Sequence, residues 1–166
     1  MKLKQGTISW LIGCHSPIHS FLVLRSWKIL YGKYPKLWQI ACIFIHDIGH
    51  IGLDYLDDYG QKKVHYELGA CIGRALFGEK AYKFLAGHCS HSGHELSELY
   101  KADKYSWYIA PIWFLYWNNI VEPKLAINCS SNMDAIIKFK AAVKQSIESG
   151  DYTSTHKFYL DRVNEK

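Results

Sequence analysis

Apolar residues recur along the chain at steps of three and four, and strict alternation of apolar and polar residues is rare. This spacing predicts amphipathic helices, because it gathers the apolar side chains on one helical face. The helix ends follow from capping residues: Ser16 and Pro17 are typical of a helix start, and Gly32 of a helix end. The predicted helices cover residues 17–31, 35–48, 61–77, 79–89, 95–109, 133–148 and 154–163. We therefore predict an all-α fold with negligible strand content.

The composition is typical of one globular domain. Of the 166 residues, 49% are hydrophobic and 21% are charged, which is enough apolar material for a sizeable core. We therefore predict a single domain over residues 1–166. The formal net charge of +5 comes from Lys and Arg residues spread along the chain, so a small phosphorylated molecule fits it as well as nucleic acid does.

The cysteines and the most apolar segment indicate the compartment. Five cysteines, an odd number without a CxxC pair, argue against a disulfide framework and favour a reducing, cytoplasmic location. Residues 105–121 are the most membrane-like stretch, but they are short and are interrupted by Pro111 and Asn118. We expect no membrane contact. This aromatic segment is expected to form core or a subunit interface, which leaves a homo-oligomer open.

The stretch FIHDIGHIG, residues 44–52, places His46 and Asp47 at the end of an apolar run and then adds His50. Burying an unpaired carboxylate is costly, so something must compensate the charge of Asp47. A bound cation is one candidate. An ion pair between His46 and Asp47 at the helix end is the structural alternative.

Other histidines and one aspartate fall on neighbouring predicted helices, where they can face a common centre. His19 lies in a first turn, His65 near a helix start, His88 at a helix end and Asp103 inside a helix. Taken singly, His65 or His88 would more simply be a core histidine. Inward-facing imidazoles and carboxylates from several helices are how helical proteins bind first-row metals, and Asp47 can bridge two of them. The predicted metal ligands are His19, His46, Asp47, His65, His88 and Asp103.

The order of these ligands resembles the motif order of the HD-domain superfamily of metal-dependent phosphohydrolases, which is His, then His-Asp, then one or more His, then Asp. The matching segments are HSFLVLRSW, FIHDIGHIG, HYELGA, AGHCSHSG and KADKYS, and they span residues 15 to about 108. The resemblance implies an HD-domain-like helical bundle with a metal-binding core over that range, followed by the aromatic segment and C-terminal helices over 109–166. It also implies a divalent transition metal cofactor, one or two ions of Fe, Mn, Co or Mg.

Particular branches of the superfamily are similar to parts of the chain. HYELGA followed by the AGH segment resembles the HD-GYP phosphodiesterases of cyclic di-GMP. The chain differs from them because His88 is followed by Cys89 rather than a second histidine, His50 replaces a lysine, and GYP is absent. These differences argue against degradation of cyclic di-GMP. The segment HDIGH is similar to the motif of deoxynucleoside triphosphate triphosphohydrolases and to that of mixed-valent di-iron oxygenases on the same fold.

Several histidines near the motifs have two interpretations each. His50 is either an acid that protonates the leaving group or a solvated histidine after the helix end. His15 is the alternative to His19 as the first ligand, but Pro17 places it before the helix. His91 and His94 lie in a predicted loop, where either would contact substrate phosphate, a second metal or only solvent.

The remaining candidates are cationic or thiol side chains. Arg25 and Lys104 suit anionic oxygens near the site, while solvated surface charge is their default interpretation. A structural zinc site built from Cys89, His88 and His91 is a further alternative, and the presence of only one cysteine there argues against it.

The resemblance implies hydrolysis of a phosphoester or phosphoanhydride, in a nucleotide or a related small molecule, by metal-activated water. Asp47 and His50 would be the catalytic residues. Arg25, His91 and Lys104 would bind the anionic, phosphorylated substrate. Two alternatives stay open: a mixed-valent di-iron oxygenase with the same six ligands, and a non-catalytic binding module whose metal only holds the helices together.

Overall fold

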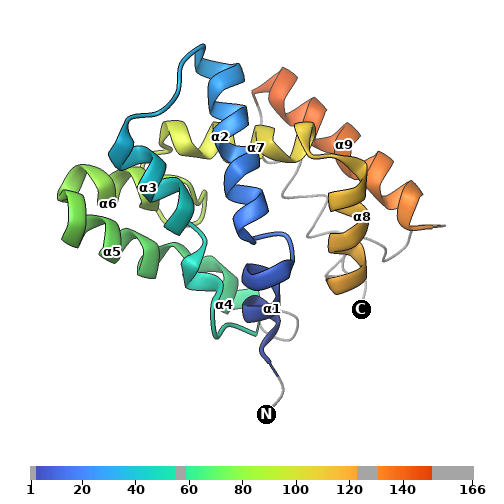
Figure 1. Ribbon diagram of the computed structural model, residues 1–166, viewed down its shortest axis with the longest axis horizontal. Coiled ribbons are helices and arrows are strands. Elements are labelled where there is room, and N and C mark those ends of the chain that lie inside the picture. The colour runs from blue at the N-terminus through green and yellow to red at the C-terminus, as the bar shows by residue number, and fades with distance from the viewer. Residues whose placement is uncertain (1–2, 55–58, 123–130, 151–166) are drawn as a thin grey trace. The chain divides into compact units, whose positions relative to one another are not determined.

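The computed structural model describes residues 3–54, 59–122 and 131–150, and within these ranges the chain is helical with no strand (Figure 1). The elements are α1 (Gln5–Ile12), α2 (Pro17–Tyr31), α3 (Leu37–Ile45), the 3₁₀ turn η1 (Ile48–His50), α4 (Tyr59–Lys63), α5 (Tyr66–Phe77), α6 (Glu79–Ala86), α7 (Glu98–Ile109), α8 (Ile112–Val121) and α9 (Asn132–Ser149). The all-α prediction is confirmed. The helix predicted over 154–163 lies outside the described residues.

The chain divides into two compact units, residues 1–106 and 107–166. The division falls near the end of α7, two residues before position 108, where the predicted metal-binding core ends. The single-domain interpretation of the sequence stays a prediction.

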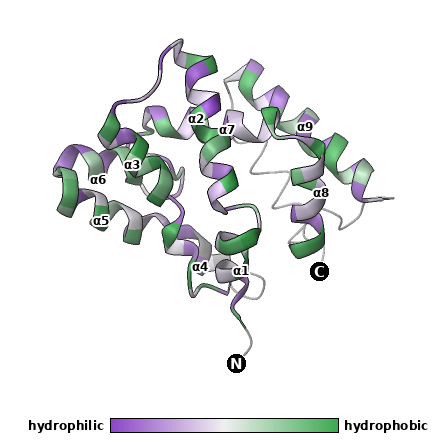
Figure 2. Ribbon diagram, viewed as in Figure 1, coloured by the Kyte–Doolittle hydropathy of each residue, from purple (hydrophilic) through white to green (hydrophobic). Residues whose placement is uncertain are grey.

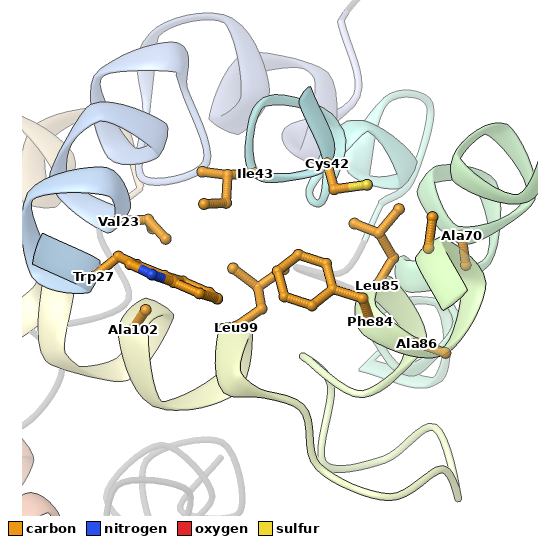
Figure 3. Close-up of a cluster of buried hydrophobic side chains, with 11 residues drawn as sticks. Val23, Trp27, Cys42, Ile43, Ala70, Phe84, Leu85, Ala86, Leu99 and Ala102 are labelled. Carbon is orange, nitrogen blue, oxygen red and sulfur yellow. The ribbon is translucent and has the colours of Figure 1, made fainter. Parts of the chain in front are cut away.

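The first unit has its own apolar core, formed by helices distant in sequence. Figure 3 shows side chains from α2, α3, α6 and α7 pointing toward one another. The central contacts join aromatic rings: Trp27 lies 5.8 Å from Phe84, and Trp38 lies 5.3 Å from Phe84, between ring centroids. We call this set the core cluster; its members are Val23, Trp27, Cys42, Ile43, Ala70, Ala81, Phe84, Leu85, Ala86, Leu99 and Ala102.

The second unit is built on α8 and α9, which pack against each other. Phe114 and Phe139 are buried, and the ring of Trp107 lies 6.4 Å and 6.1 Å from theirs. Trp113 on the same helix as Phe114 is 61% exposed, so the aromatic segment has a buried face and an exposed one. Figure 2 shows hydrophobic and hydrophilic residues alternating along α9, in the manner of an amphipathic helix.

The predicted start of α2 is correct, whereas the predicted end of the following helix is wrong. Pro17 is the first residue of α2, and Gly32 ends it with φ 69°. The next helix was expected to reach Ile48, but α3 ends at Ile45 and the chain passes through His46 and Asp47 into η1. The Nδ1 atom of His46 bonds to a carbonyl of the last turn, which helps to end the helix there.

The helix predicted over 61–77 is interrupted, so that α4 ends at Lys63 and α5 begins at Tyr66. The interruption lies where η1 packs against α5. A side chain at Gly49 would overlap the carbonyl group of His65, so only glycine allows these two backbones to approach. The close approach brings His65, which immediately precedes α5, next to the segment that carries Asp47.

Smaller boundary differences concern α6 and α7. α6 was expected to reach Cys89 but ends at Ala86, and α7 begins at Glu98 rather than Glu95. The Ser97 hydroxyl donates to the carbonyl of Phe84 at 2.7 Å, and the Ser97 N–H donates to the carbonyl of Gly87 at 2.9 Å. These bonds hold the segment between the two helices against the end of α6.

Helix α1, like α8, has no counterpart among the helices predicted from the sequence. It has no side-chain cap, and Leu11 and Ile12 are exposed, so its own pattern is weak. It is held by a tertiary contact in which the N–H of Gly6 donates to the carbonyl of Leu53 at 2.9 Å. In the described part of the chain, no single helix is long and apolar enough to cross a membrane. Only α1 and α2 taken together, with a bend of 58° between them, have the length and composition for it.

Candidate metal centre

Six side chains from five helices and the adjoining turns converge inside the first unit. Each lies at or near an element end except Asp103, which is inside α7: His19 is in the first turn of α2, His46 and Asp47 follow α3, His65 precedes α5, and His88 follows α6. All are buried except His65, whose side chain is 12% exposed. We call these six residues the His/Asp centre. The structure therefore brings together all the ligands predicted from the sequence.

The first ligand group consists of His19, His46 and Asp103, whose ligand atoms all lie within 4.8 Å of one another. The Nε2 atom of His19 is 2.9 Å from Oδ1 of Asp103, and Nε2 of His46 is 3.9 Å from the same oxygen. Two imidazoles and a carboxylate at this spacing can surround one divalent ion.

The second ligand group consists of Asp47, His65 and His88, again within 4.8 Å. The two Nε2 atoms of His65 and His88 face each other at 3.0 Å. That separation is about what two nitrogens show when both bind one ion at roughly 2.0–2.1 Å. Without an ion, one of these nitrogens has to be protonated to avoid two opposed lone pairs.

Asp47 lies between the two groups, and its two oxygens face different ones. Oδ2 is 3.0 Å from Nε2 of His46 and 3.6 Å from Nε2 of His19. Oδ1 is 3.7 Å from Nε2 of His65 and 3.6 Å from Nε2 of His88. This is the arrangement of a carboxylate that can bridge two metals.

Hydrogen bonds on the far side of the rings orient two of the ligands. Nδ1 of His46 donates to the carbonyl of Ile43 at 2.6 Å, and Nδ1 of His88 donates to the carbonyl of Leu85 at 2.5 Å. A carbonyl oxygen can only accept, so each neutral ring carries its lone pair on Nε2, the atom that points into the centre. Metal-binding histidines are commonly oriented by such bonds.

Ser106 plays the same part for His19, and it was not among the residues singled out from the sequence. Its hydroxyl donates to the carbonyl of Asp103 at 2.6 Å, which leaves the oxygen to accept from Nδ1 of His19 at 3.4 Å. The lone pair of His19 then points toward the Asp103 carboxylate. A lone pair facing an ionised carboxylate is repulsive unless a cation or a proton lies between them, which fits a metal at this position.

The charges of the centre shift the pKa values of its acids in one direction. Burial by itself would raise the pKa of Asp47, but the charges of His46 and His15 and their hydrogen bonds hold it well below its usual range. For Asp103, burial again raises the pKa, while Lys104 and His19 lower it by more, so both carboxylates stay ionised.

The histidines respond in two directions. Burial lowers the pKa of His46, but the charge of Asp47 outweighs it and the pKa is raised. Burial also lowers the pKa of His15, but the charges of Cys14 and Asp47 outweigh it, and the pKa is raised well above its usual value. For His19, burial prevails over the contacts with Asp103 and the pKa is lowered. The centre thus favours positive charge around Asp47.

His15, the alternative to His19 as the first ligand, also reaches the centre. It lies in the turn before α2, as Pro17 predicted, and its Nδ1 donates to Oδ2 of Asp47 at 2.8 Å. His50 is fully buried, with Nε2 3.7 Å from Oδ1 of Asp47, so it is not a solvated histidine. The two residues and Asp47 form a third set of ligand atoms within 4.8 Å.

The three residues expected to bind substrate differ in position. Lys104 is at the centre: its Nζ is 3.1 Å from Oδ2 of Asp103, and its side chain is 30% exposed. Arg25 and His91 are exposed and belong to none of the three ligand groups. Cys89 is buried, with its thiol 3.9 Å from the carbonyl of Lys63, and it too lies outside these groups.

Compared with known proteins, the chain matches no family model, no curated protein and no solved structure. Geometry alone therefore identifies the site: a buried cluster of histidines and aspartates that could hold a metal ion lies within residues 1–106.

Proposed function

We propose that the chain is an HD-type metal-dependent phosphohydrolase that binds two divalent ions and hydrolyses a small phosphorylated substrate, a nucleotide or a related molecule. The observation that carries the proposal is Asp47, whose Oδ2 faces the group of His19, His46 and Asp103 and whose Oδ1 faces His65 and His88. Fe, Mn, Co and Mg are the candidate ions, and the imidazole-rich groups favour the first three over Mg.

Bound ions at these positions would supply an activated water for attack on phosphorus and would neutralise charge on the phosphoryl oxygens. The protein's own residues do the rest. Asp47 holds the two positions at a fixed separation. The Nζ atom of Lys104 forms an ion pair with Oδ2 of Asp103 at 3.1 Å, so the other oxygen, Oδ1, faces Nε2 of His19 at 2.9 Å.

Lys104 and His50 supply the other chemical roles. Burial alone would lower the pKa of Lys104, but the Asp103 charge raises it, so the ammonium stays protonated and can also donate to a phosphoryl oxygen. Because its side chain is 30% exposed, it lies on a side of the centre that solvent reaches. His50 lies 3.7 Å from Asp47, close enough to the centre to give a proton to the leaving oxygen.

A turnover screen tests this proposal. Purified protein is loaded in turn with manganese, iron, cobalt and magnesium and is assayed against nucleotides, cyclic dinucleotides and phosphomonoesters. We expect phosphate-ester cleavage with at least one ion, and a rate at least about a hundredfold lower in the Asp47→Asn protein. His94 is exposed and its ring contacts those of Tyr66 and Tyr82, so His94→Ala is the matched control and should keep the activity.

The outcomes separate the alternatives. Protein that holds two ions yet cleaves none of these substrates contradicts the hydrolase proposal. A coupled mixed-valent signal in electron paramagnetic resonance of partly reduced, iron-loaded protein would then indicate the di-iron oxygenase. Unfolding on metal removal, without turnover of any kind, would indicate the metal-stabilised binding module.

A further inference from the structure

Helix α8 of the second unit exposes most of its large apolar side chains. It is ten residues long and contains no charged residue. Five of its hydrophobic residues follow one another at steps of one, three, one and three, so they lie along one side of the helix, and each is between 43% and 61% exposed. We call this set the aromatic face; its members are Ile112, Trp113, Tyr116, Trp117 and Ile120. A helix that is apolar on nearly all sides is normally covered on all of them.

The inner side of α8 makes this exposure more notable. Asn118 and Asn119 are buried, and in the described part of the chain their amide groups have no hydrogen-bond partner. Burying an unpaired amide is unfavourable, whereas burying a tryptophan or an isoleucine is favourable. The helix thus directs two polar residues inward and five hydrophobic ones outward. This is the reverse of a solvated amphipathic helix, and it indicates that a partner covers the outer side.

We propose that the aromatic face binds a second copy of the chain, with the two α8 helices packed antiparallel about a two-fold axis. With the axis between Tyr116 and Trp117, each of these rings meets the other residue of the opposite copy. Trp113 and Ile120 lie equally far from the axis, three residues before Tyr116 and three after Trp117. The most exposed ring of the face, that of Trp113, therefore meets the smaller Ile120 of the other copy.

The area of the face is sufficient for a weak, reversible dimer. A buried aromatic side chain covers about 150–250 Å², so three rings that are about half exposed leave roughly 300 Å² uncovered on each copy. The two isoleucines add to this area. Counted over both copies, the contact buries roughly 800–1,000 Å², which is close to the lower limit for a specific interface.

The lack of charge on α8 favours a second copy over other partners. In an antiparallel pair about a two-fold axis, a charged residue near the axis would be brought close to its own equivalent, which is strongly unfavourable. The aromatic face has no such residue. A lipid surface fits less well, because helices that lie in a membrane interface carry Lys and Arg on their polar side, and α8 has neither.

Sedimentation equilibrium of the full chain tests the proposal. We expect wild type to dimerise reversibly between about 1 and 100 μM. Trp113→Glu and Ile120→Lys each place a charge against an apolar side chain of the other copy, and each should raise the dissociation constant of the dimer at least about thirtyfold. The sign of each charge suits its end of α8, so the helix itself should be retained. Leu76, on α5 of the first unit, is 64% exposed, so Leu76→Lys is the matched control and should dimerise as wild type does.

An equimolar mixture of the two variants tests the antiparallel arrangement. In a mixed dimer, the introduced carboxylate of one chain faces the introduced ammonium group of the other. The symmetry-related contact keeps the original tryptophan and isoleucine. We therefore expect the mixture to dimerise at least about tenfold more tightly than either variant alone.

Wild type that stays monomeric over this concentration range overturns the proposal. Trp113→Glu protein that dimerises as wild type does also overturns it, and Ile120→Lys decides the matter if Trp113→Glu does not melt cooperatively. A mixture that associates no better than the single variants contradicts the antiparallel arrangement. Monomeric wild type that sediments with phosphatidylcholine vesicles would assign the face to a lipid surface instead. The hydrolase proposal is independent of all these outcomes, because none of them measures metal binding or turnover.

Discussion

The His/Asp centre and the core cluster occupy the same helices of the first unit, and both are buried, yet they are stabilised by opposite means. On α2, His19 belongs to the centre, while Val23 and Trp27, four and eight residues on, belong to the core cluster. On α7, Leu99 belongs to the core cluster and Asp103, four residues later, to the centre. Residues four apart lie on one helical face, so each helix contributes to both regions.

The two regions differ in the interactions that make their burial favourable. Burial by itself stabilises the apolar side chains of the core cluster (Figure 3). Burial of the imidazoles and carboxylates of the centre is unfavourable, and only protons, ions and hydrogen bonds compensate its cost. Buried ionisable groups of this kind are more typical of functional sites than of apolar cores.

Replacing Asp47 should show the largest effect on function. Asp47→Asn removes the charge that faces both ligand groups while keeping the shape of the side chain. We expect metal affinity and turnover to fall by at least about a hundredfold, because removing even an indirect partner of a ligand costs about 10–100-fold. Metal content after dialysis and initial rates measure this effect. Unchanged metal content in the mutant would mean that Asp47 is only a packing residue.

The matched change in the core cluster should have the opposite profile. Leu99→Ala removes a fully buried side chain one helical turn from Asp103. Its free energy of unfolding should fall by about 2–5 kcal/mol, while the number of ions per folded chain stays the same. Denaturant melts and metal analysis on the same sample check both parts. Loss of an ion in this variant would show that the two regions are coupled more closely than their chemistry suggests.

Ser106 offers a smaller change at the border of the two regions. Ser106→Ala removes the acceptor for Nδ1 of His19, which frees that ring to turn. We expect about a tenfold loss of metal affinity at the first ligand group and a loss of about 1 kcal/mol in stability. Titration with Co²⁺, followed by its absorption, resolves the two groups. Ser106→Thr, which keeps the hydroxyl, serves as the control and should bind as wild type does.

The smallest expected effect concerns the pH dependence of the melting temperature, which should have opposite signs without and with metal. Without metal, the raised pKa values of His15 and His46 stabilise the fold below their ordinary pKa of about 6.5, and this contribution is lost as the pH rises through the folded values. His19, whose pKa is lowered, acts in the opposite direction, but it is one group against two. The melting temperature in chelator should therefore fall from pH 6 to pH 8.

With metal, the trend should be reversed, because ions and protons compete for the same nitrogens and binding improves as the pH rises. A difference of 1 kcal/mol corresponds to about 2–4 °C for a chain of this length. Melts at four pH values, with chelator and with Mn²⁺, give the comparison. Parallel curves would indicate that these histidines act as an ion-pair network and not as ligands. At lower pH both forms should lose stability below about 3.8, because the pKa values of Asp47 and Asp103 are lowered.

Most helices could be predicted because capping residues and apolar spacing are local signals. Pro17 and Gly32 bound α2 as expected. The errors occur where distant backbones meet: α4 and α5 separate at His65 because Gly49 of η1 packs against its carbonyl, and α1 depends on a hydrogen bond to Leu53. A sequence pattern within one helix contains no information on such a contact.

That the six residues of the His/Asp centre lie together could likewise be predicted from helix positions and motif order; their binding of metal stays a prediction. What the sequence did not show is how the neighbours of the centre are arranged. His15 precedes its helix, so spacing along α2 could not place it against Asp47. Ser106 is an ordinary residue of α7, and only its position three residues after Asp103 is a signal for its contact with His19.

The carbonyl groups that hold His46 and His88 have a kinetic consequence. Each belongs to a residue three positions earlier, Ile43 or Leu85, whose own side chain is immobilised in the core cluster. These two imidazoles are therefore aligned before any ion arrives, and little rotational freedom is lost when one binds. For an ion that binds as proposed, uptake should be limited by its approach to the centre rather than by rearrangement of these two ligands. Slow exchange of a bound ion would then indicate that the surrounding helices must open locally to release it.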